Sequence, residues 1–593
     1  MDTRKYADHF TGVLAELGYS HCFLLPGGAT MHLVDAARQQ MITVPFVHEV
    51  SAAIATEYFN EISEAGRAYS LVTAGPGITN AMTGIAGAYL ESRDLLIVGG
   101  QVKSADLKAE GMRQRGIQEI DGVALVTPIT KGAVRIESPL ADDEVVALVS
   151  LGLTDRRGPI FFEFCLDAQG APVQHTEPKT EGFNAGPSSG MVSNAHSAAE
   201  RIAAELRSAQ RPLVLIGGGV SHHVASQLSD ALASMNIPLM TTWNGFDRIP
   251  DSHPLFAGRP NTWGQRSANI LLSQADLVVA LGTRLGIQQT GFNWQEWTKA
   301  RVVHVDVDPQ ELNKAHPQVD VSLQADADTV LELLAAQVFS PPASWFAHCT
   351  GVRAQLPLID PANAHGAGFL SPYELVDQLS KAMAVGDILI PASSGSGQFV
   401  PMEVFRSKPG QRVITNKGLA SMGYGLAAAI GAALAAPSRR TVLVEGDGSF
   451  SQNIQELGTV AVHQLNLKVV LLDNDGYASI RTTQRNYFGG AYVGCDTATG
   501  LGFPDWTQLA QAFGIPVITL DANGLESSAA QALLDAPGPA ILIAKVDPEQ
   551  TYFPKVASQV APDGSMISNA ISNMSPPLDD DTAKRVAHLE VGS

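Results

Sequence analysis

The segment TVLVEGDGSFSQNIQELGTVAVHQLNLKVVLLDNDG, from Thr441 to Gly476, predicts a βαβ unit. It begins with an apolar run, Thr441 to Val444, and a second apolar run spans Leu467 to Leu472. Apolar residues recur at helical spacing between these runs, at Ile454, Leu457 and Val460. Two short buried strands joined by a helix are typical of a parallel sheet, and we expect one here.

Both predicted strands end at residues with oxygen-bearing side chains. The first ends at Gly446-Asp447-Gly448, and the second ends at Asp473-Asn474-Asp475-Gly476. The carboxyl ends of neighbouring parallel strands lie at the same edge, where open α/β sheets bind ligands. A carboxylate, an amide oxygen and backbone carbonyls suit Mg²⁺, which takes oxygen ligands and binds phosphates. We therefore expect a metal site at Asp447 and Asn474, with a plain surface turn as the alternative.

Length and charge restrict the class of protein. At 593 residues the chain exceeds a single core, and about three or four domains are expected from length alone. Apolar residues make up 45% and charged residues 17%, which is an ordinary globular composition. The net charge of −20 argues against binding to nucleic acid or to a membrane surface, because both need a basic face. We expect neither among its partners.

Targeting signals and cysteine motifs are not evident. The start of the chain, MDTRKYADHFTGVLAELGYSH, is amphipathic and lacks the continuous apolar core of a signal peptide. No run approaches the roughly 18–20 apolar residues of a membrane span. The four cysteines contain no CxxC pair, so neither a zinc site nor a disulfide framework is indicated. These features predict a cytoplasmic protein.

The chain divides into blocks of alternating strand and helix patterns. Two segments rich in Pro, Gly, Ser and Ala, near residues 172–193 and 338–370, lack periodicity and indicate linkers. The predicted fold class is α/β, with three consecutive parallel-sheet domains. The expected divisions are a first domain at 1–172, a central domain at 194–337, a third domain at 370–548 and a polar tail at 549–593.

Motifs in the first and third domains resemble those of the thiamine diphosphate enzymes. GDG followed at this distance by Asn474 resembles the metal signature of that family. PGGAT (Pro26–Thr30), HEVSAA (His48–Ala53) and TAGPGITNAMTGIAGAYLES (Thr73–Ser92) resemble the pyrimidine-binding domain of its acetolactate synthase branch. The likeness covers about residues 5–550. It implies a pyrimidine-binding, a central and a diphosphate-binding domain, in that order.

The resemblance implies four residues near the reacting centre. Glu49 would hydrogen-bond the aminopyrimidine ring of the cofactor and favour its activation, a role that needs a carboxylate in an apolar pocket. Met422 would bend the cofactor, Gly28 would let a small ketone approach, and Gln118 would line the substrate channel. From the residues alone, the alternatives are a helix-start acid, a core methionine and an exposed loop glutamine.

The resemblance also implies contacts with thiamine diphosphate and its Mg²⁺. The implied metal ligands are Asp447, Asn474 and the backbone carbonyl of Gly476. The implied cofactor-binding residues are Gly75, Asn80, Ser396, Gly397, Gln398, Ala420, Met422, Gly448, Ser449, Tyr477 and Ala478. From the residues alone, the alternatives are a simple turn at Gly75-Pro76-Gly77 and a helix cap at Thr79 or Asn80.

The central domain contains a pattern that resembles flavin contacts. The run LVLIGGGV places three glycines at 217–219, and DLVVALGTRLG contains Arg284. In acetolactate synthases this domain binds FAD, so the resemblance implies FAD as a possible further cofactor. The alternative is a nucleotide-type fold that binds no ligand.

Two departures from the family pattern concern the acceptor substrate. After Arg284 the family carries two acids and an arginine associated with a second keto acid, whereas this chain has Leu285-Gly286-Ile287-Gln288. Thr483 lies near the place of an acceptor-selecting tryptophan. A carboxylate acceptor would lose its cation, unless Arg481 substitutes for it. Pyruvate is therefore expected as donor rather than as acceptor.

Taken with these departures, the resemblance implies a carboligase that depends on thiamine diphosphate and Mg²⁺. It would decarboxylate a 2-keto acid and join the two-carbon unit to a second carbonyl compound. The alternatives are a simple 2-keto acid decarboxylase, acetyl transfer onto a ketone or keto sugar, and a non-catalytic relative that retains the fold. A homodimer or homotetramer is expected, because in this family Glu49 of one subunit faces the diphosphate domain of another.

Overall fold

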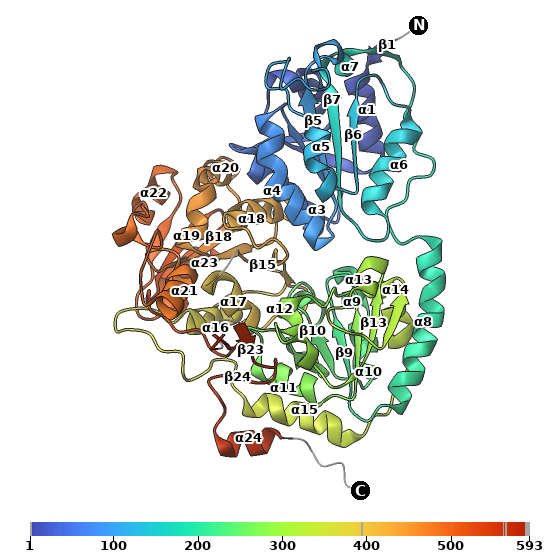
Figure 1. Ribbon diagram of the computed structural model, residues 1–593. Helices are drawn as coiled ribbons and strands as arrows, with labels where there is room; N and C mark the ends of the chain where they lie inside the picture. Colours follow the sequence, from blue (N-terminus) through green and yellow to red (C-terminus); the bar gives the residue numbers. More distant parts are fainter. Residues whose placement is uncertain (1–2, 393–394, 561, 564–565, 588–593) are drawn as a thin grey trace.

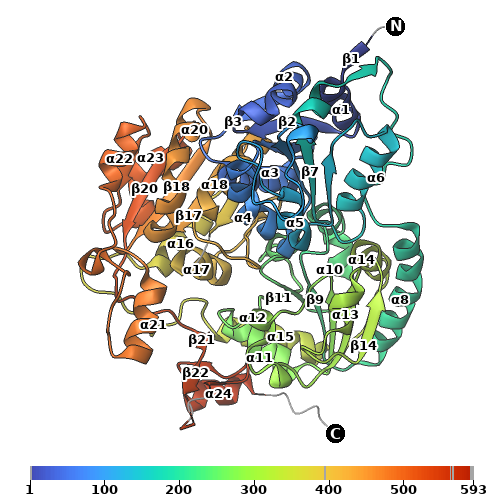
Figure 2. The same cartoon turned by 45° about the horizontal axis from the view of Figure 1, so that its top comes forward.

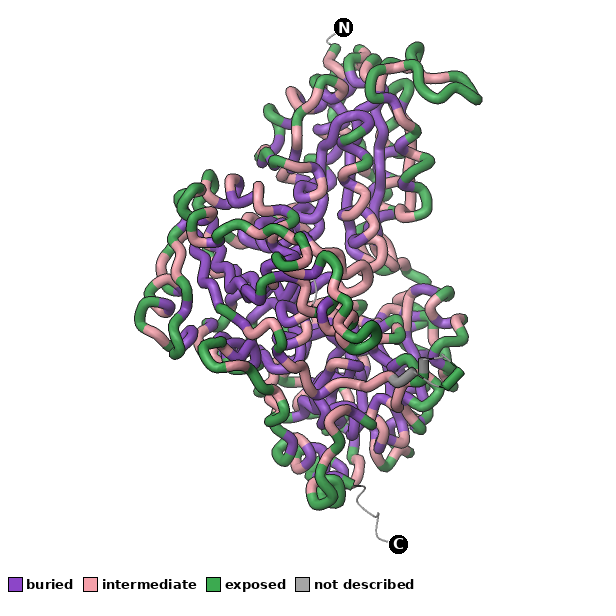
Figure 3. Tube along the Cα trace, turned by 60° about the vertical axis from the view of Figure 1, so that its left-hand side comes forward, coloured by how far each residue is buried: buried purple, intermediate pink, exposed green. Residues whose placement is uncertain are grey.

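The computed structural model describes residues 3–392, 395–560, 562–563 and 566–587. Three six-stranded parallel sheets follow one another along the chain, each flanked by helices, and they are blue, green and orange in Figure 1. Figure 3 shows buried strands inside a shell of partly buried and exposed helices and loops. The predicted fold class is therefore confirmed. The domain boundaries given above stay predictions.

The first sheet lies in the N-terminal part of the chain. Its strands, in spatial order, are β3 (Ile42–Pro45), β2 (Tyr19–Leu24), β4 (Arg67–Val72), β5 (Leu95–Gln101), β7 (Pro159–Cys165) and β6 (Gly132–Ile136). The helices around it are α1 (Tyr6–Glu16), α2 (Met31–Gln40), α3 (Glu49–Ile62), α4 (Pro76–Glu91), α5 (Gly122–Val126), α6 (Asp142–Leu153) and α7 (Leu166–Gly170). A short ribbon of β1 (Thr3–Lys5) and β8 (Pro172–Gln174) lies beside them. Every residue of β5 and β7 is buried, as expected for central strands covered on both faces.

The third sheet repeats the connectivity of the first. Its strands, in spatial order, are β16 (Arg412–Val413), β15 (Ile388–Pro391), β17 (Thr441–Gly446), β18 (Leu467–Asp473), β20 (Ala540–Lys545) and β19 (Val517–Thr519). Its helices are α16 (Pro372–Ala382), α17 (Ser396–Val404), α18 (Tyr424–Ala435), α19 (Asp447–Phe450), α20 (Leu457–Val462), α21 (Ala478–Phe488), α22 (Trp506–Ala512) and α23 (Ser528–Asp535). In both sheets the first strand in chain order lies between the second and the third.

The helix predicted between the two strands of the βαβ unit is broken. The strands form as expected, but the connection is α19, a 3₁₀ segment at Ser451–Glu456 and α20. Asn453 leaves the helical conformation, with φ −132° and ψ 30°. Its side-chain amide donates to the carbonyl of Gly423 at 2.6 Å, a contact between distant segments that a local periodicity does not report.

The central sheet has a different order. Its strands are β11 (Phe256–Gly258), β10 (Leu239–Thr241), β9 (Pro212–Ile216), β12 (Leu277–Leu281), β13 (Arg301–Asp306) and β14 (Val321–Gln324), which is the order of dinucleotide-binding sheets. Its helices are α8 (Ser189–Ser208), α9 (His222–Gln227), α10 (Ser229–Ser234), α11 (Arg266–Gln274), α12 (Ile287–Thr290), α13 (Pro309–Asn313), α14 (Ala327–Ala335) and α15 (Ala343–Gln355).

The C-terminal segment folds back onto the central domain. Its elements are β21 (Lys555–Val556), β22 (Ser558–Val560), β23 (Met566–Ser568), β24 (Met574–Ser575) and α24 (Asp580–Val586). The amide of Val556 donates to the carbonyl of Thr262 at 2.9 Å, and Ile571 is fully buried in the central core. Within the described residues, no helix is both long and apolar enough to cross a membrane.

The first and third domains meet where α3 packs against α18, as Figures 1 and 2 show. A buried polar cluster lies beside this contact. Arg93 donates to the Glu57 carboxylate at 2.8 Å and to the carbonyl of Thr415 at 2.8 Å, and the hydroxyl of Tyr424 donates to Glu57. Burial raises the pKa of Glu57 to about 7, and the charge of Arg93 opposes that rise.

The packing of α3 on α18 requires Gly431. A Cβ atom at this position would collide with the carbonyl of Ala55 in α3. We predict that Gly431→Ala lowers the free energy of unfolding by about 1–3 kcal/mol through overpacking. Gly351→Ala in α15 is the control, because nothing lies within 4 Å of its Cβ position. It should be neutral or stabilising. Thermal unfolding midpoints check this, and a Gly431 variant as stable as the control would contradict it.

Candidate active site

The predicted binding loops of the third domain lie at the point where the strand order reverses. From β15 the chain continues to β16 on one side of the pair, and from β17 it continues to β18 on the other side. In open α/β sheets such a reversal leaves a crevice between the two strands at their carboxyl ends. Ser396 and Gly397 begin α17 after β15, and Asp447 follows β17. A Cβ on Gly397 would lie 3.0 Å from the Cα of Glu445, so the start of α17 packs directly against the end of β17. Ser396 is buried at 4% exposure.

The predicted metal ligands come together at this edge. The Oδ2 atom of Asp447 accepts a hydrogen bond from the amide of Gly476 at 3.0 Å, and Oδ1 accepts from the amide of Gly448 at 2.8 Å. Asn474 is 4% exposed, and its Oδ1 has no hydrogen-bond partner among the described residues. Such a buried, unpaired acceptor needs an explanation, and a bound cation supplies one.

The donor set at this edge fits Mg²⁺. Among the described residues, no group of three or more His, Cys, Asp or Glu side chains could hold a metal. The set here is instead a carboxylate, an amide oxygen and a carbonyl, which hard cations accept. Burial raises the pKa of Asp447 to about 7, with a further contribution from Asp473. A nearby cation would oppose that rise.

Tyr477 and Ser449 make contacts that the sequence did not specify. A Cβ on Gly448 would collide with the Tyr477 ring, so the glycine permits that packing. The Ser449 hydroxyl donates to Glu445 at 2.6 Å and accepts from the amide of Gly423 at 2.9 Å. Its proton is therefore engaged within the protein, and its expected role toward phosphate stays a prediction.

Gln398 is fully buried and holds the segment that leads to Met422. Its Nε2 donates to Thr415 Oγ1 at 2.8 Å and to the carbonyl of Asn416 at 3.1 Å. Its Oε1 accepts from Lys417 Nζ at 3.1 Å. In this arrangement its side chain braces residues 415–417, and a contact with diphosphate stays a prediction.

The loop before α18 is shaped by Asn416. Its Oδ1 accepts from the amides of Leu419 and Ala420, and Ala420 has a left-handed φ of 50°. Met422 follows and is only partly buried, which disfavours the alternative of an ordinary core methionine. The role of Met422 in shaping a bound cofactor stays a prediction.

The first domain brings a second group of predicted residues together. Glu49 begins α3, is 5% exposed, and accepts a hydrogen bond from Asn80 Nδ2 at 3.0 Å. Asn80 lies inside α4, so it does not cap that helix. Gly75 has a φ of 63°, and a Cβ on it would collide with the carbonyl of Gln118. Nothing lies within 4 Å of a Cβ on Gly28, which leaves room for a small molecule.

Within the described residues, no hydrogen bond joins the predicted residues of the first domain directly to those of the third. The two groups of predicted residues are instead linked through their neighbours. Glu456 lies in the segment after Asp447, and its carboxylate accepts from the amide of His48 at 3.0 Å. It thus caps the helix that begins at Glu49. One chain therefore presents two partial sites, one around Glu49 and one around Asp447.

Ala478 and Gly395 connect the helix after the metal loop to the crevice. Ala478 is the first residue of α21, and a Cβ on Gly395 would lie 3.2 Å from the hydroxyl oxygen of Ser479 in that helix.

A cavity of about 370 Å³ lies at the same edge, within the range of small-molecule sites. Its lining includes Asp447, Asp473, Asp475, Asp505, Phe503, Trp506 and Lys545.

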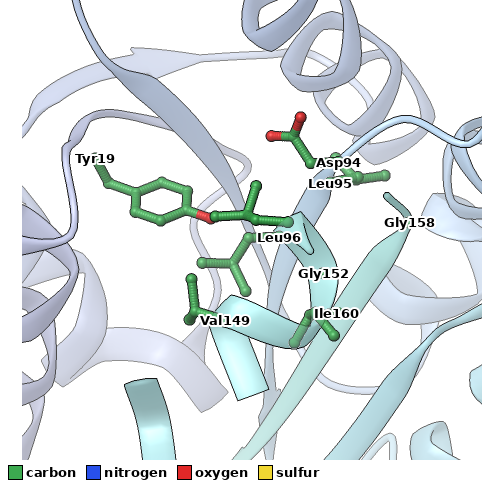
Figure 4. Close-up of a pocket in the computed structure, with 9 residues that line it drawn as sticks. Tyr19, Asp94, Leu95, Leu96, Val149, Gly152, Gly158 and Ile160 are labelled. Carbon is green, nitrogen blue, oxygen red and sulfur yellow. The ribbon is translucent and has the colours of Figure 1, made fainter. Parts of the chain in front are cut away.

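Figure 4 shows a second cavity, which lies in the first domain among Tyr19, Asp94, Leu96, Val149 and Ile160. Its volume of about 10 Å³ leaves room for one water molecule at most. It is a packing defect beside the sheet and is distinct from the crevice at the carboxyl edge.

The three central glycines have a structural explanation. The amides of Gly217 and Gly219 donate to the carbonyls of Leu281 and Gly282, each at 2.8 Å. A Cβ on Gly219 would lie 2.8 Å from the Cα of Gly282, so the glycines let the ends of β9 and β12 touch. Arg284 is exposed. FAD binding here stays a prediction, which the absorption spectrum of the purified protein checks.

The sequence did not predict two carboxylates that organise these loops. Glu119 is 3% exposed and accepts from the amides of Lys108, Arg115 and Gly116 at 2.6, 2.8 and 2.8 Å. Glu91, at the end of α4, accepts from the amides of Lys417 and Gly418 and from the side chain of Asn244. Glu91 binds groups distant in sequence, whereas Glu119 binds amides 3, 4 and 11 positions before it, in a loop without helix or strand periodicity, so no local pattern indicated either residue.

Three family models match the chain in order. The thiamine pyrophosphate enzyme N-terminal TPP binding domain matches residues 4–125, the central domain matches 199–334, and the C-terminal TPP binding domain matches 393–544. The acetolactate synthase isozyme 1 large subunit of Escherichia coli (strain K12) is 29% identical over 540 residues, or 90% of this chain and 92% of the relative. The isozyme 2 large subunit is 30% identical over 563 residues, or 94% and 97%. The acetolactate synthase large subunit of Pyropia yezoensis is 30% identical over 559 residues, or 91% of both.

Glu119 should control the order of the loop that carries Gln118. Burial raises the pKa of Glu119, but the backbone amides lower it further, so the net shift favours the carboxylate. We predict that Glu119→Gln makes trypsin cleave at Arg113 and Arg115 roughly tenfold faster, because hydrogen bonds to a charged group are lost. Fragment masses over time check this. Glu110→Gln, on an exposed residue of the same loop, is the control. Equal cleavage rates in the two variants would refute it.

Proposed function

The chain belongs to the acetolactate synthase-like family of thiamine diphosphate enzymes, and from that premise we propose that it is a carboligase. The proposed reaction decarboxylates a 2-keto acid, pyruvate in the first instance, and joins the two-carbon unit to a second carbonyl compound. The observation that carries it is the sheet edge where Asp447 and the unpaired Oδ1 of Asn474 lie together.

The proposed cofactors are thiamine diphosphate and Mg²⁺. Asp447, Asn474 and the carbonyl of Gly476 would hold Mg²⁺ against the diphosphate. When bound, thiamine diphosphate supplies a carbon nucleophile and an electron sink for the bond that releases CO₂. The protein has to supply the binding, the orientation and the proton transfers.

Glu49 is the proposed proton-handling residue. It is buried at a helix start, and the hydrogen bond from Asn80 orients its carboxylate. In that position it would hold a proton at a ring nitrogen of the cofactor. Met422 would shape the bound cofactor, and the open space at Gly28 would admit the small donor. Gln118, held against Gly75, would line the entry for substrate.

We propose that the acceptor carries no carboxylate next to its carbonyl. The family's arginine for a second keto acid is replaced by the run Leu285–Gln288. Arg481, which could substitute, is 4% exposed and donates to the backbone carbonyls of Asn474, Asp475 and Pro548. Three of its five N–H donors are therefore already in use, and its Nε lies 3.4 Å from the Asp496 carboxylate. A neutral aldehyde, ketone or keto sugar needs no such cation.

Product analysis tests the reaction. With pyruvate and a panel of aldehydes, ketones and keto sugars, we expect mass spectrometry to find products enlarged by an acetyl unit. Glu49→Gln should lower kcat by at least about 100-fold, because a positioned acid–base group contributes that much. Free acetaldehyde as the main product would favour a simple decarboxylase instead. Acetolactate from pyruvate alone would contradict the proposed acceptor class.

We propose that the complete site forms between two copies of the chain. The partial sites around Glu49 and Asp447 are not directly joined within one chain. Exposed apolar residues lie beside both of them: Ile117 at 87%, Tyr487 at 46%, Phe488 at 65% and Val493 at 73% exposure. In a two-fold dimer, Glu49 of one copy would complete the Asp447 site of the other.

Complementation tests the shared site. Glu49→Gln and Asp447→Asn should each be inactive alone, whereas co-refolded or co-expressed mixtures should regain activity. Half of the dimers would be mixed, and each mixed dimer would hold one intact site, so about a quarter of wild-type activity is expected. Sedimentation should find at least a dimer. An active monomer, or a mixture that stays inactive despite forming mixed dimers, would rule the shared site out.

A further inference from the structure

Arg481 is a charged residue that the proposed reaction does not use. It lies one turn into α21, and its amide donates to the carbonyl of Tyr477 at 2.9 Å. Its residue exposure is only 4%. A guanidinium stays protonated at any accessible pH, so its burial requires partners that satisfy the whole group.

The partners of the Arg481 guanidinium come from three segments. Nη2 donates to the carbonyl of Asp475 at 3.0 Å, and Nη1 donates to the carbonyls of Asn474 at 3.4 Å and Pro548 at 3.2 Å. Nε lies 3.4 Å from the Asp496 carboxylate. The planar guanidinium thus holds the loop of Asn474 and Asp475, the segment that follows β20 and Asp496 in one arrangement.

The Asp496 segment braces the same loop from its other side. Gly476 and Asp496 form an antiparallel bridge, and the amide of Tyr477 donates to the carbonyl of Cys495 at 2.8 Å. Gly476 has a φ of 135°, and a Cβ on it would collide with that carbonyl. The loop that presents Asn474 and Gly476 therefore has little freedom while Arg481 keeps these segments together.

We propose that Arg481 is a positioning residue that raises the metal affinity of the site. It would do so by holding the loop of Asn474 and Gly476 in place without touching the metal. This rests on the proposed function only in assigning Asp447, Asn474 and Gly476 to the metal. Groups that orient metal ligands without touching the metal commonly contribute 10–100-fold to affinity. The same contacts disfavour Arg481 as the receptor of an acceptor carboxylate, because four of its five N–H donors already face backbone carbonyls or Asp496.

Metal binding tests the proposal without relying on turnover. The probe is Mn²⁺ with thiamine diphosphate, and the free ion is measured by electron paramagnetic resonance. Arg481→Met should weaken Mn²⁺ binding about 10–100-fold, and Arg481→Lys should weaken it less, because lysine offers a point charge without the fork. Arg485→Met is the matched control: it lies one turn further along α21 and pairs with Glu549 on the exposed side. It should change the affinity by less than about twofold.

Kinetics separate positioning from substrate binding. At saturating Mg²⁺, Arg481→Lys should recover most of its kcat and keep the wild-type KM for the acceptor. A raised acceptor KM that persists at saturating Mg²⁺ would show that Arg481 binds substrate and overturn the proposal. Asp496→Asn serves as a second variant, because it weakens one contact of the Arg481 guanidinium and keeps the arginine itself. It should weaken Mn²⁺ binding as well.

The outcomes distinguish this inference from the proposed function. If wild-type protein binds Mn²⁺ and Asp447→Asn abolishes binding, the metal site stands. Unchanged affinity in folded Arg481→Lys and Asp496→Asn would then overturn the role of Arg481 alone. If wild-type protein with thiamine diphosphate binds no Mn²⁺, the metal assignment and the proposed function fail together.

Discussion

The hydrogen bond from the Gly476 amide to Asp447 is the contact on which the candidate site depends. It joins the ends of β17 and β18, two neighbouring parallel strands whose carboxyl ends meet at one edge. The bond turns the loop after β18 toward the carboxylate, and the buried amide oxygen of Asn474 has no hydrogen-bond partner among the residues that the structure describes. A sheet edge with a buried, unpaired oxygen lowers the stability of the fold unless a cation or a hydrogen-bond donor binds that oxygen. Tyr477, packed on Gly448, fixes the same turn from the other side.

The two outer domains use one connectivity for two different tasks. In each, the loops after the first and third strands flank the point where the strand order reverses. The third domain fills that point with oxygen ligands, and the first domain fills it with glycine turns beside the Glu49–Asn80 pair. The direct packing of α3 on α18 then sets the angle between the domains, while Glu91 joins both of them to the central domain through Asn244. The central domain is therefore part of the frame of the site.

Sequence patterns predicted what depends on neighbours along the chain. The strands of the βαβ unit, the acid after the first, the amide after the second and the helix-start position of Glu49 all follow from local periodicity. Contacts between distant segments were beyond that reach. Asn453 breaks a predicted helix because it binds Gly423, and Glu91 binds the amides of Lys417 and Gly418. Glu119 binds three amides within its own loop, which has no periodicity to indicate it. Arg481 looked like a free cation because its carbonyl partners carry no sequence signature.

The burial of Arg481 also bears on the acceptor class proposed above. The cavity at the sheet edge is lined by Asp447, Asp473, Asp475 and Asp505, and its one lining cation, Lys545, already pairs with Asp473. Two like charges 4 Å apart repel by about 4 kcal/mol at the effective dielectric of a protein surface. Mg²⁺ held by Asp447 and Asn474 would reduce that repulsion for groups close to it. A second carboxylate entering this cavity would meet no cation among its described lining residues other than Lys545. A neutral carbonyl compound would meet no such repulsion, which supports the uncharged acceptor proposed above.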